Sequence, residues 1–243
     1  MAYKIVYAIF YAMSLLPYRV MYCISDFFYL IIYYIVRYRK NVVRKNLTTA
    51  FPDKDEKEIV SIEKGYYHWL CDYFVEALKL LSVSDKTLLK HIEFRNVEEL
   101  EQHYDRGQTC AAILGHYCNW ELLSATGLAF KRHKDAVCGL IYHPLRSDIF
   151  DELFKDIRQS KGGVCIPKRD ILRYLVTYKR EKRMWLFGYI SDQSPKWSNI
   201  HLWLPFLNHD TPVFTGGERI MRKMNDAVFY VDMERPKRGK YIC

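Results

Sequence analysis

The sequence predicts an α/β fold in which a helical, membrane-anchoring N-terminal region precedes a mixed, mostly parallel sheet flanked by helices. Two observations lead to this prediction. Residues 3–36 are almost wholly apolar and aromatic, and beyond Gly107 short apolar runs alternate with amphipathic segments. Such alternation is typical of strands joined by right-handed helical crossovers. We therefore divide the chain into an anchor and basic segment (1–50), a helical region (51–106) and an α/β core (107–243).

The composition indicates a folded, basic protein. Half of the 243 residues are hydrophobic, which excludes a disordered chain. The net charge of +9 favours anionic partners, which are phospholipid headgroups, an acidic protein or nucleic acid. The seven cysteines contain no C-x-x-C pair, so they predict neither a disulfide framework nor a thiolate metal site and fit a reducing compartment.

The first element expected is the apolar segment from Tyr3 to Val36, which Pro17 interrupts. Each half barely reaches the ~20 residues that a spanning helix needs, so a spanning helix, an interfacial helix and a buried core helix all stay open. The basic stretch RYRKNVVRKN follows directly, as expected on the cytoplasmic side of a membrane. Four tyrosines fit an aromatic belt at the interface: Tyr29, Tyr33, Tyr34 and Tyr38.

Hydrophobic periodicity predicts the remaining elements. Apolar residues three and four apart predict a long helix over residues 53–81, capped by Asp53 or Asp55, and a short helix follows at 84–90. Strands are expected at 109–114, 136–142, 164–166, 184–190 and 227–233, with helices at 120–131, 148–159, 170–179 and 217–223. Ligands of such sheets gather beyond the carboxyl ends of the strands, where GHYCNWE, HPLRS and SDQSP fall.

The GHYCNWE stretch contains the most informative pair, His116 and Glu121. Five positions are too many for neighbours on one helical face, so His116 is expected before the helix, with Asn119 as its N-cap. The chain can then fold His116 back onto Glu121, which would fix the tautomer of the imidazole and make it a general base. The alternative is a histidine at a helix start that serves only as a capped structural residue.

The dyad brings no nucleophile of its own. Ser124 is near, but it lies on the expected helix without the strained elbow of a catalytic serine. A substrate hydroxyl, deprotonated by His116 as it attacks an activated acyl carbonyl, is therefore the expected nucleophile. His143, His201 and His209 lack acidic or thiolate partners at ligand spacing, so no metal site is expected.

Motifs spread over the chain resemble one enzyme family. The stretch GHYCNWE resembles the His-x4-Asp/Glu (HX4E) signature of the glycerolipid acyltransferase superfamily, in the form found in the lipid A biosynthesis acyltransferases of Gram-negative bacteria. RKNLTTAFPDKDEKEI, IRQSKGGVCIP, ISDQSP and LPFLNHDTPVFTGG resemble further motifs of that family in the same order. The resemblance implies a glycerolipid acyltransferase-like fold and a lauroyl- or myristoyl-type transferase of lipopolysaccharide synthesis.

Carried over, the resemblance implies roles for individual residues. His116 would be the general base and Glu121 its partner, while Asn119 would lie beside the reacting carbonyl or hold the loop. Arg158 would bind substrate phosphate or brace the acidic residue. The loop residues that would line the acceptor side are Asp192 and Gln193. On residue type alone, an equally good interpretation is that Asp192 and Gln193 only form a turn and that Arg158 is a solvated charge on a helix.

The expected function is transfer of a fatty acyl chain to a hydroxyl of a lipid A precursor, at the cytoplasmic face of the bacterial inner membrane. No cofactor is expected, because acyl carrier protein or acyl-CoA thioester is the donor substrate. Anionic membrane lipids and the acidic carrier are the expected partners, and no nucleic-acid motif accompanies the basic charge. Two alternatives stay open: another acceptor, such as a lysophospholipid or an amino-acid lipid, and a catalytically dead, membrane-bound lipid-binding homologue.

One departure from the resemblance concerns the end of the chain. Members of the family usually continue to a further helix and a tryptophan-rich end, whereas this sequence stops at RPKRGKYIC. A truncated chain with exposed sheet surface is therefore expected.

Overall fold

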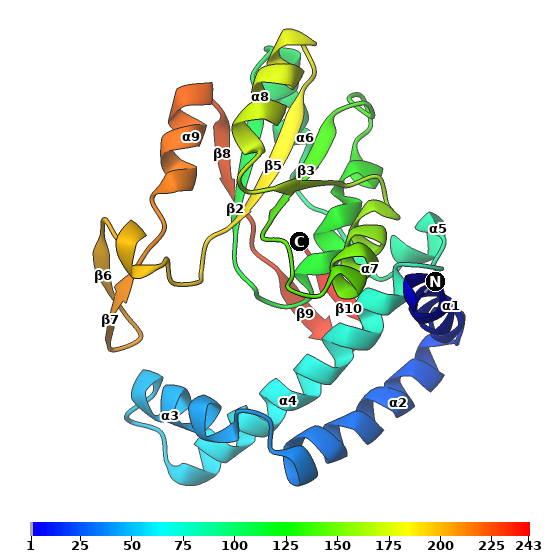
Figure 1. The fold of residues 1–243 in the computed structure, drawn as a ribbon, viewed down its shortest axis with the longest axis vertical. Coiled ribbons are helices and arrows are strands. Elements are labelled where there is room, and N and C mark those ends of the chain that lie inside the picture. The colour runs from blue at the N-terminus through cyan, green and yellow to red at the C-terminus, as the bar shows by residue number, and fades with distance from the viewer. Residues whose placement is uncertain (1) are drawn as a thin grey trace.

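A parallel five-stranded sheet forms the centre of the computed structural model, which describes residues 2–243 (Figure 1). The strand order is β4-β3-β5-β2-β8, and every neighbouring pair is parallel. The strands are β2 (Cys110–Leu114), β3 (Val137–Tyr142), β4 (Val164–Pro167), β5 (Trp185–Ile190) and β8 (Ala227–Tyr230). All five predicted strands are present, although β8 ends three residues earlier than expected.

Helices cover both faces of this sheet. On one face α8 (Ile171–Arg180) and α9 (Gly216–Met224) pack on a core that includes the buried Phe187. The other face holds α6 (Val97–Asp105), which the sequence analysis missed, and η2 (Trp120–Ala129). The expected α-helix over 120–131 is this shorter 3₁₀ helix η2. Outside η2 lies α7 (Asp148–Gln159), as predicted.

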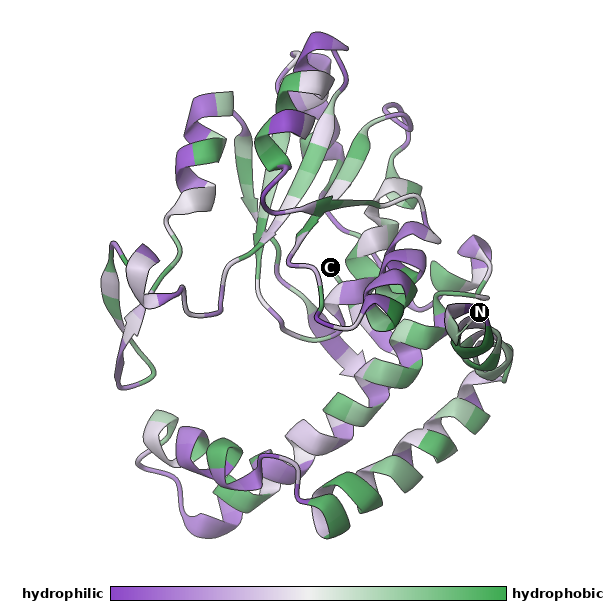
Figure 2. Ribbon diagram, viewed as in Figure 1, coloured by the Kyte–Doolittle hydropathy of each residue, from purple (hydrophilic) through white to green (hydrophobic). Residues whose placement is uncertain are grey.

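The N-terminal region forms a helical arm below the sheet (Figure 1). Pro17 separates α1 (Ala2–Ser14) from α2 (Tyr18–Leu30), which continues as the π-helix η1 (Ile31–Val36). Tyr18–Val36 is the one helix of residues 2–243 that is long and apolar enough to cross a membrane. Figure 2 shows hydrophobic residues along its length. Only 22% of this stretch is buried inside the protein, so most of its apolar surface is free.

Two of the four tyrosines expected in an interfacial belt belong to the core instead. Tyr29 and Tyr33 are buried against Tyr67 and Cys71 of the long helix α4 (Glu56–Lys79). Aromatic residues one helical turn apart pack on a neighbouring helix as readily as they meet an interface. Helix periodicity alone therefore could not separate the two surroundings.

The basic segment after η1 also has a structural part. It forms α3 (Lys40–Ala50), and Arg44 donates two hydrogen bonds to Glu63, a fully buried carboxylate of α4. Lys40 lies 3.8 Å from the same carboxylate. Helix α4 begins with a capping box between Asp55 and Glu58, so Asp55 rather than Asp53 is the cap. The short α5 (Asp85–Leu88) follows.

Two small sheets complete the fold, and the sequence analysis predicted neither. Strands β1 (Ile92–Glu93), β10 (Lys240–Ile242) and β9 (Glu234–Lys237) place the last residues beside the helical arm. The antiparallel hairpin of β6 (Trp203–Phe206) and β7 (His209–Pro212) follows the short 3₁₀ helix η3 (Trp197–Asn199) and projects from the core. Edge strand β8 leaves Val228 and Tyr230 exposed.

Candidate active site

The register of two central strands brings together residues 76 positions apart. Leu114 at the end of β2 lies opposite Ile190 at the end of β5. His116 follows the first strand by two residues and Asp192 follows the second by two, so the parallel register places them side by side. The sequence had assigned both residues to the carboxyl edge of the sheet, but not to each other.

His116 is held by two hydrogen bonds to one carboxylate. Its Nδ1 lies 2.7 Å from Asp192 Oδ1, and its backbone N–H donates to Asp192 Oδ2 at 2.7 Å. An ionised carboxylate only accepts, so Nδ1 carries the proton and a neutral ring keeps Nε2 as a free acceptor. With 32% of the His116 side chain exposed, this acceptor is accessible.

The predicted hydrogen bond between His116 and Glu121 does not form. Glu121, whose side chain is 2% exposed, accepts from Arg158 Nε at 2.8 Å and from its Nη2 at 2.7 Å. Tyr73 adds a hydrogen bond at 3.1 Å. The first turn of η2 directs Glu121 toward α7, away from the strand end that carries His116. Of the two roles predicted for Arg158, the structure contains the ion pair with the acidic residue.

The surroundings of this pair favour the charged form of Arg158 and the neutral form of Tyr73. Burial alone would lower the pKa of Arg158, but its hydrogen bonds with Glu121 and the carboxylate charge outweigh burial and raise it. Tyr73 next to them has a raised pKa because it is buried and faces the Glu121 charge. Arg158 therefore keeps its positive charge, and Tyr73 remains a neutral donor.

Buried hydrogen bonds from α4 hold the loop between His116 and Glu121. Asn119 occupies the predicted N-cap position of η2, but its buried side chain makes no cap bond and instead donates from Nδ2 to Glu76 Oε2 at 2.9 Å. Trp69 Nε1 donates to the Cys118 carbonyl at 3.2 Å. Cys118 has φ of 50°, a left-handed conformation that costs a non-glycine residue energy unless contacts such as these hold it.

Two glycines permit close approaches at the site. A Cβ on Gly115 would lie 3.2 Å from Asp192 Oδ2, so the bare backbone lets this carboxylate reach His116. A Cβ on Gly163 would lie 2.8 Å from the Arg158 carbonyl and 3.0 Å from Leu140. The second glycine thus allows the turn after α7 to pack against the sheet and η2.

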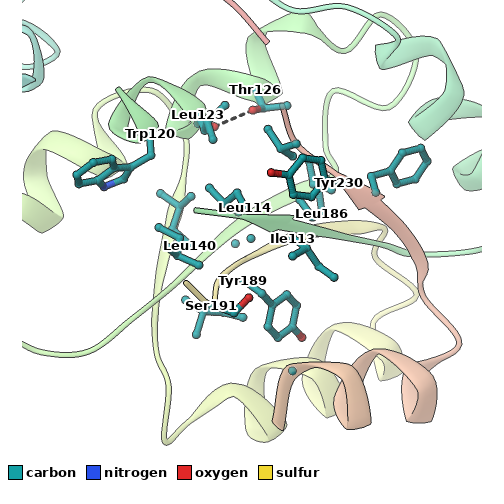
Figure 3. A pocket seen from close by; sticks show the side chains of 18 of the residues that line it. Ile113, Leu114, Trp120, Leu123, Thr126, Leu140, Leu186, Tyr189, Ser191 and Tyr230 are labelled. Atoms are coloured by element: carbon teal, nitrogen blue, oxygen red, sulfur yellow. Dashed lines mark hydrogen bonds between the residues drawn. The ribbon is translucent and has the colours of Figure 1, made fainter. Parts of the chain in front are cut away.

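A large cavity, of about 1450 Å³, wraps around the carboxyl edge of the sheet and includes His116 in its wall. One part lies between the sheet and η2, and Figure 3 shows Leu114, Leu140 and Leu186 projecting there between Trp120 and Tyr230. The second part lies on the face covered by α8 and α9. The lining there includes Ile113, Ile171, Tyr189, Phe214 and Met221. The wall of the cavity is mainly apolar, and the imidazole of His116 belongs to it.

Polar and charged residues also contribute to the cavity wall. Glu121, Arg158 and Gln193 line the cavity, together with Lys168 and Lys196. Neither lysine pairs with a carboxylate anywhere in residues 2–243. Across that same part of the chain, no group of three or more His, Cys, Asp or Glu side chains is arranged to hold a metal ion. Thus the site combines an imidazole, two lysines without a carboxylate partner and apolar walls.

The sequence analysis missed the residues that support the site from α4. Trp69, Tyr73 and Glu76 touch the GHYCNWE loop or Glu121, and Trp120 lies edge-on to the His116 ring, with centroids 4.8 Å apart. The acidic Glu76 within an apolar helix face was the one available signal, because a buried carboxylate needs donors. Ser124 donates to the Glu121 carbonyl, which agrees with its exclusion as a nucleophile.

Comparison with known proteins gives the chain its family. Residues 2–242 match the family model described as bacterial lipid A biosynthesis acyltransferase. This match covers nearly the whole chain, so the protein belongs to that family and is an acyltransferase, as the resemblance implied. A search of curated proteins found no match.

Proposed function

We propose that this member of the lipid A biosynthesis acyltransferase family moves a fatty acyl chain from a carrier thioester to a hydroxyl of a lipid A precursor, with His116 as general base. The observation that carries the proposal is the His116–Asp192 hydrogen bond at the wall of an apolar cavity. Asp192 orients the ring and stabilises the imidazolium formed during reaction, so it replaces Glu121 in the predicted dyad.

The reaction follows from this geometry. His116 Nε2 takes the proton of the acceptor hydroxyl while its oxygen attacks the thioester carbonyl carbon. The tetrahedral intermediate collapses with cleavage of the C–S bond, giving the ester and a thiolate, which is a good leaving group. The imidazolium then returns its proton to the thiolate or to solvent. No cofactor takes part, and the acyl-loaded carrier is a substrate.

The intermediate also needs donors for its oxyanion. The first turn of a helix leaves its backbone N–H groups without intrahelical partners, and η2 begins at Trp120 next to His116. We assign the oxyanion to these donors. The ion pair of Glu121 with Arg158 fixes this turn against α7, so both are positioning residues, and Asn119 holds the preceding loop through Glu76.

The cavity and its rim fit the two substrates. Its mainly apolar wall suits the acyl chains of the donor and the acceptor, and the proposed base belongs to the same wall. Lys168 and Lys196 line the cavity without a carboxylate partner and can meet phosphates, whereas Nε and Nη2 of Arg158 are already bound to Glu121. A basic surface also suits acyl carrier protein, whose acidic charge would steer its approach. Gln193 lies on the same rim, on the proposed acceptor side.

The helical arm would attach the enzyme to the cytoplasmic face of the inner membrane. Helix α2 pairs through Asp26 with Arg238 at 2.6 Å. Tyr29 of α2 and Tyr33 of η1 pack on α4, while Phe27 of α2 and Ile35 of η1 are exposed. A helix with one packed side and one apolar exposed side lies along an interface rather than through it. We therefore favour interfacial attachment, with anionic lipids meeting the basic segment.

An acyl-transfer assay tests this function. The purified chain is incubated with acyl carrier protein thioesters of several chain lengths and a tetra-acylated lipid A precursor, and products are weighed by mass spectrometry. The proposal predicts a gain of one acyl chain that is lost in His116→Ala. If only a lysophospholipid or an amino-acid lipid is acylated, the proposed acceptor is wrong. If the folded protein acylates none of the acceptors, the proposed mechanism is contradicted.

A further inference from the structure

The β6–β7 hairpin exposes an unusual amount of apolar surface. Every residue of β6 is exposed, and the large apolar side chains of this region that meet solvent are Trp197, Leu202, Trp203, Leu204, Phe206, Leu207 and Phe214. Trp197 is 84% exposed. A two-stranded ribbon without a covering element is marginally stable in water. Continuous apolar patches of this kind mark surfaces that another phase or molecule covers.

The turn of the hairpin adds to this picture. Leu207 and Asn208 both have positive φ, 49° and 63°, as in the two-residue turns that suit the twist of a hairpin. Asparagine tolerates this conformation, but leucine adopts it at an energetic cost. A glycine at position 207 would adopt this backbone conformation with less strain. The leucine instead places an exposed apolar side chain at the tip of the hairpin.

The tip connects this surface to the helical arm. Asn208 Nδ2 donates to the Thr49 carbonyl near the end of α3, at 3.0 Å. Exposed apolar side chains continue from there: Phe51, Val42, Tyr38, Val36 and Ile35. Figure 2 shows hydrophobic residues on the hairpin and along α2 and η1, the two ends of this surface. The Asn208–Thr49 hydrogen bond thus ties the exposed apolar hairpin to the arm that carries the helix proposed to lie on the membrane.

Charge next to this face decides between possible occupants. Arg37, Arg39 and Lys45 are exposed and have no carboxylate partner within residues 2–243. A symmetric contact of this surface with a second copy would bring the unpaired cations of both copies into one interface, where like charges repel. Anionic lipid headgroups would neutralise these three cations. Tryptophan, which the hairpin exposes, is enriched at the interface between membrane and water.

We infer that the β6–β7 hairpin is a second membrane-inserting element, which lays its tryptophans and leucine tip into the headgroup layer of an anionic bilayer beside α2 and η1. The inference rests on the membrane attachment proposed above. Segments on both sides of the hairpin line the cavity, through Lys196 before it and Phe214 after it. Docking here would open the cavity toward the bilayer, so that acyl chains enter without crossing water.

Tryptophan quenching tests the inference on the full chain. Trp197 and Trp203 are the exposed members of five tryptophans, since Trp185 is buried and Trp69 and Trp120 are partly covered. With phosphatidylethanolamine–phosphatidylglycerol vesicles carrying brominated acyl chains, we expect strong quenching in the wild type. In the W197F/W203F variant, which keeps the apolar surface, quenching should fall more than twofold. Equal quenching in both proteins would overturn the inference.

Two variants that each introduce two glutamates measure how much the hairpin contributes to vesicle binding. W203E/F206E should lower vesicle-bound protein severalfold in sedimentation, whereas L172E/V176E, the same charge change on two exposed residues of α8, should leave it unchanged. Equal binding of both variants, or a dimer in solution that only W203E/F206E disrupts, would contradict the inference. These readouts need no acyl donor, and His116→Ala should bind vesicles like the wild type, so failure here is separate from failure of the proposed transferase.

Discussion

The two carboxylates next to the GHYCNWE loop occupy contrasting surroundings. Asp192 has 44% of its side chain exposed and pairs with a histidine that faces the cavity. Glu121 is 2% exposed and pairs bidentately with an arginine. A half-exposed pair costs little to fold and stays accessible to a substrate, whereas a buried pair is costly to break and rigid. The comparison assigns chemistry to the first pair and positioning to the second.

The largest loss of activity is expected for substitution of His116, the proposed general base. His116→Ala should reduce acyl transfer by ~10²–10⁴-fold, the usual scale for loss of a general base. Its side chain is partly exposed, so thermal unfolding should change little. Turnover measured with the carrier thioester, next to a melting curve, checks both points; wild-type turnover in a folded variant would remove His116 from the mechanism.

Arg158→Met should act through folding. It leaves Glu121 buried without its guanidinium and should cost about 3 kcal/mol, the lower end of the range for a broken buried pair, because 21% of the Arg158 side chain is exposed. For a chain of this size the midpoint of thermal unfolding should fall by about 10 °C.

The E121L/R158M double variant is the matched control for that change. Removing both charges leaves no unpaired ion, so it should recover most of the lost stability. A double variant as unstable as Arg158→Met would show that packing, rather than the ion pair, holds η2 against α7.

Asp192→Asn should lower kcat by about 10²-fold, the lower end of the general-base range, since the imidazole remains but loses its orienting carboxylate. Asp192 contacts His116 rather than the cavity, so KM should stay unchanged. Steady-state kinetics separate the two constants. A rise in KM at constant kcat would instead make Asp192 a substrate-binding residue.

The smallest effect is expected for Gly115→Ala. Its Cβ would press on the Asp192 carboxylate at 3.2 Å, which the half-exposed side chain can relieve by a small shift. Turnover should fall by less than about tenfold, as for mild overpacking. Gly65→Ala is the control, because a Cβ there meets nothing within 4 Å. Equal losses in both variants would contradict the role given to the close approach.

The sequence predicted where the residues of both pairs lie, but not which carboxylate pairs with His116. Strand ends were recognisable from apolar runs, so His116 and Asp192 were both placed at the carboxyl edge. Their contact depends on β2 and β5 being neighbours in register, which local periodicity does not encode. The pairing of Glu121 was assigned to its nearest histidine in sequence, and it failed because the first turn of η2 faces α7.

The sequence analysis also missed secondary-structure elements that have no clear pattern of apolar residues. Strands β1, β9 and β10 are only two to four residues long, so no period of apolar residues marks them, and β1 pairs with β10 across 149 positions (241 − 92). The hairpin lacks an inside face altogether, and its apolar residues resemble ordinary core. Exposure, which only the structure provides, distinguishes them.

A double-mutant cycle on acyl transfer tests the central assignment most directly. Turnover is measured for the wild type, His116→Ala, Asp192→Asn and the double variant with one carrier thioester and one acceptor. If Asp192 acts only through His116, the double variant loses no more activity than His116→Ala alone. Multiplied losses would mean that Asp192 contributes independently, and the catalytic pair described here would be wrong.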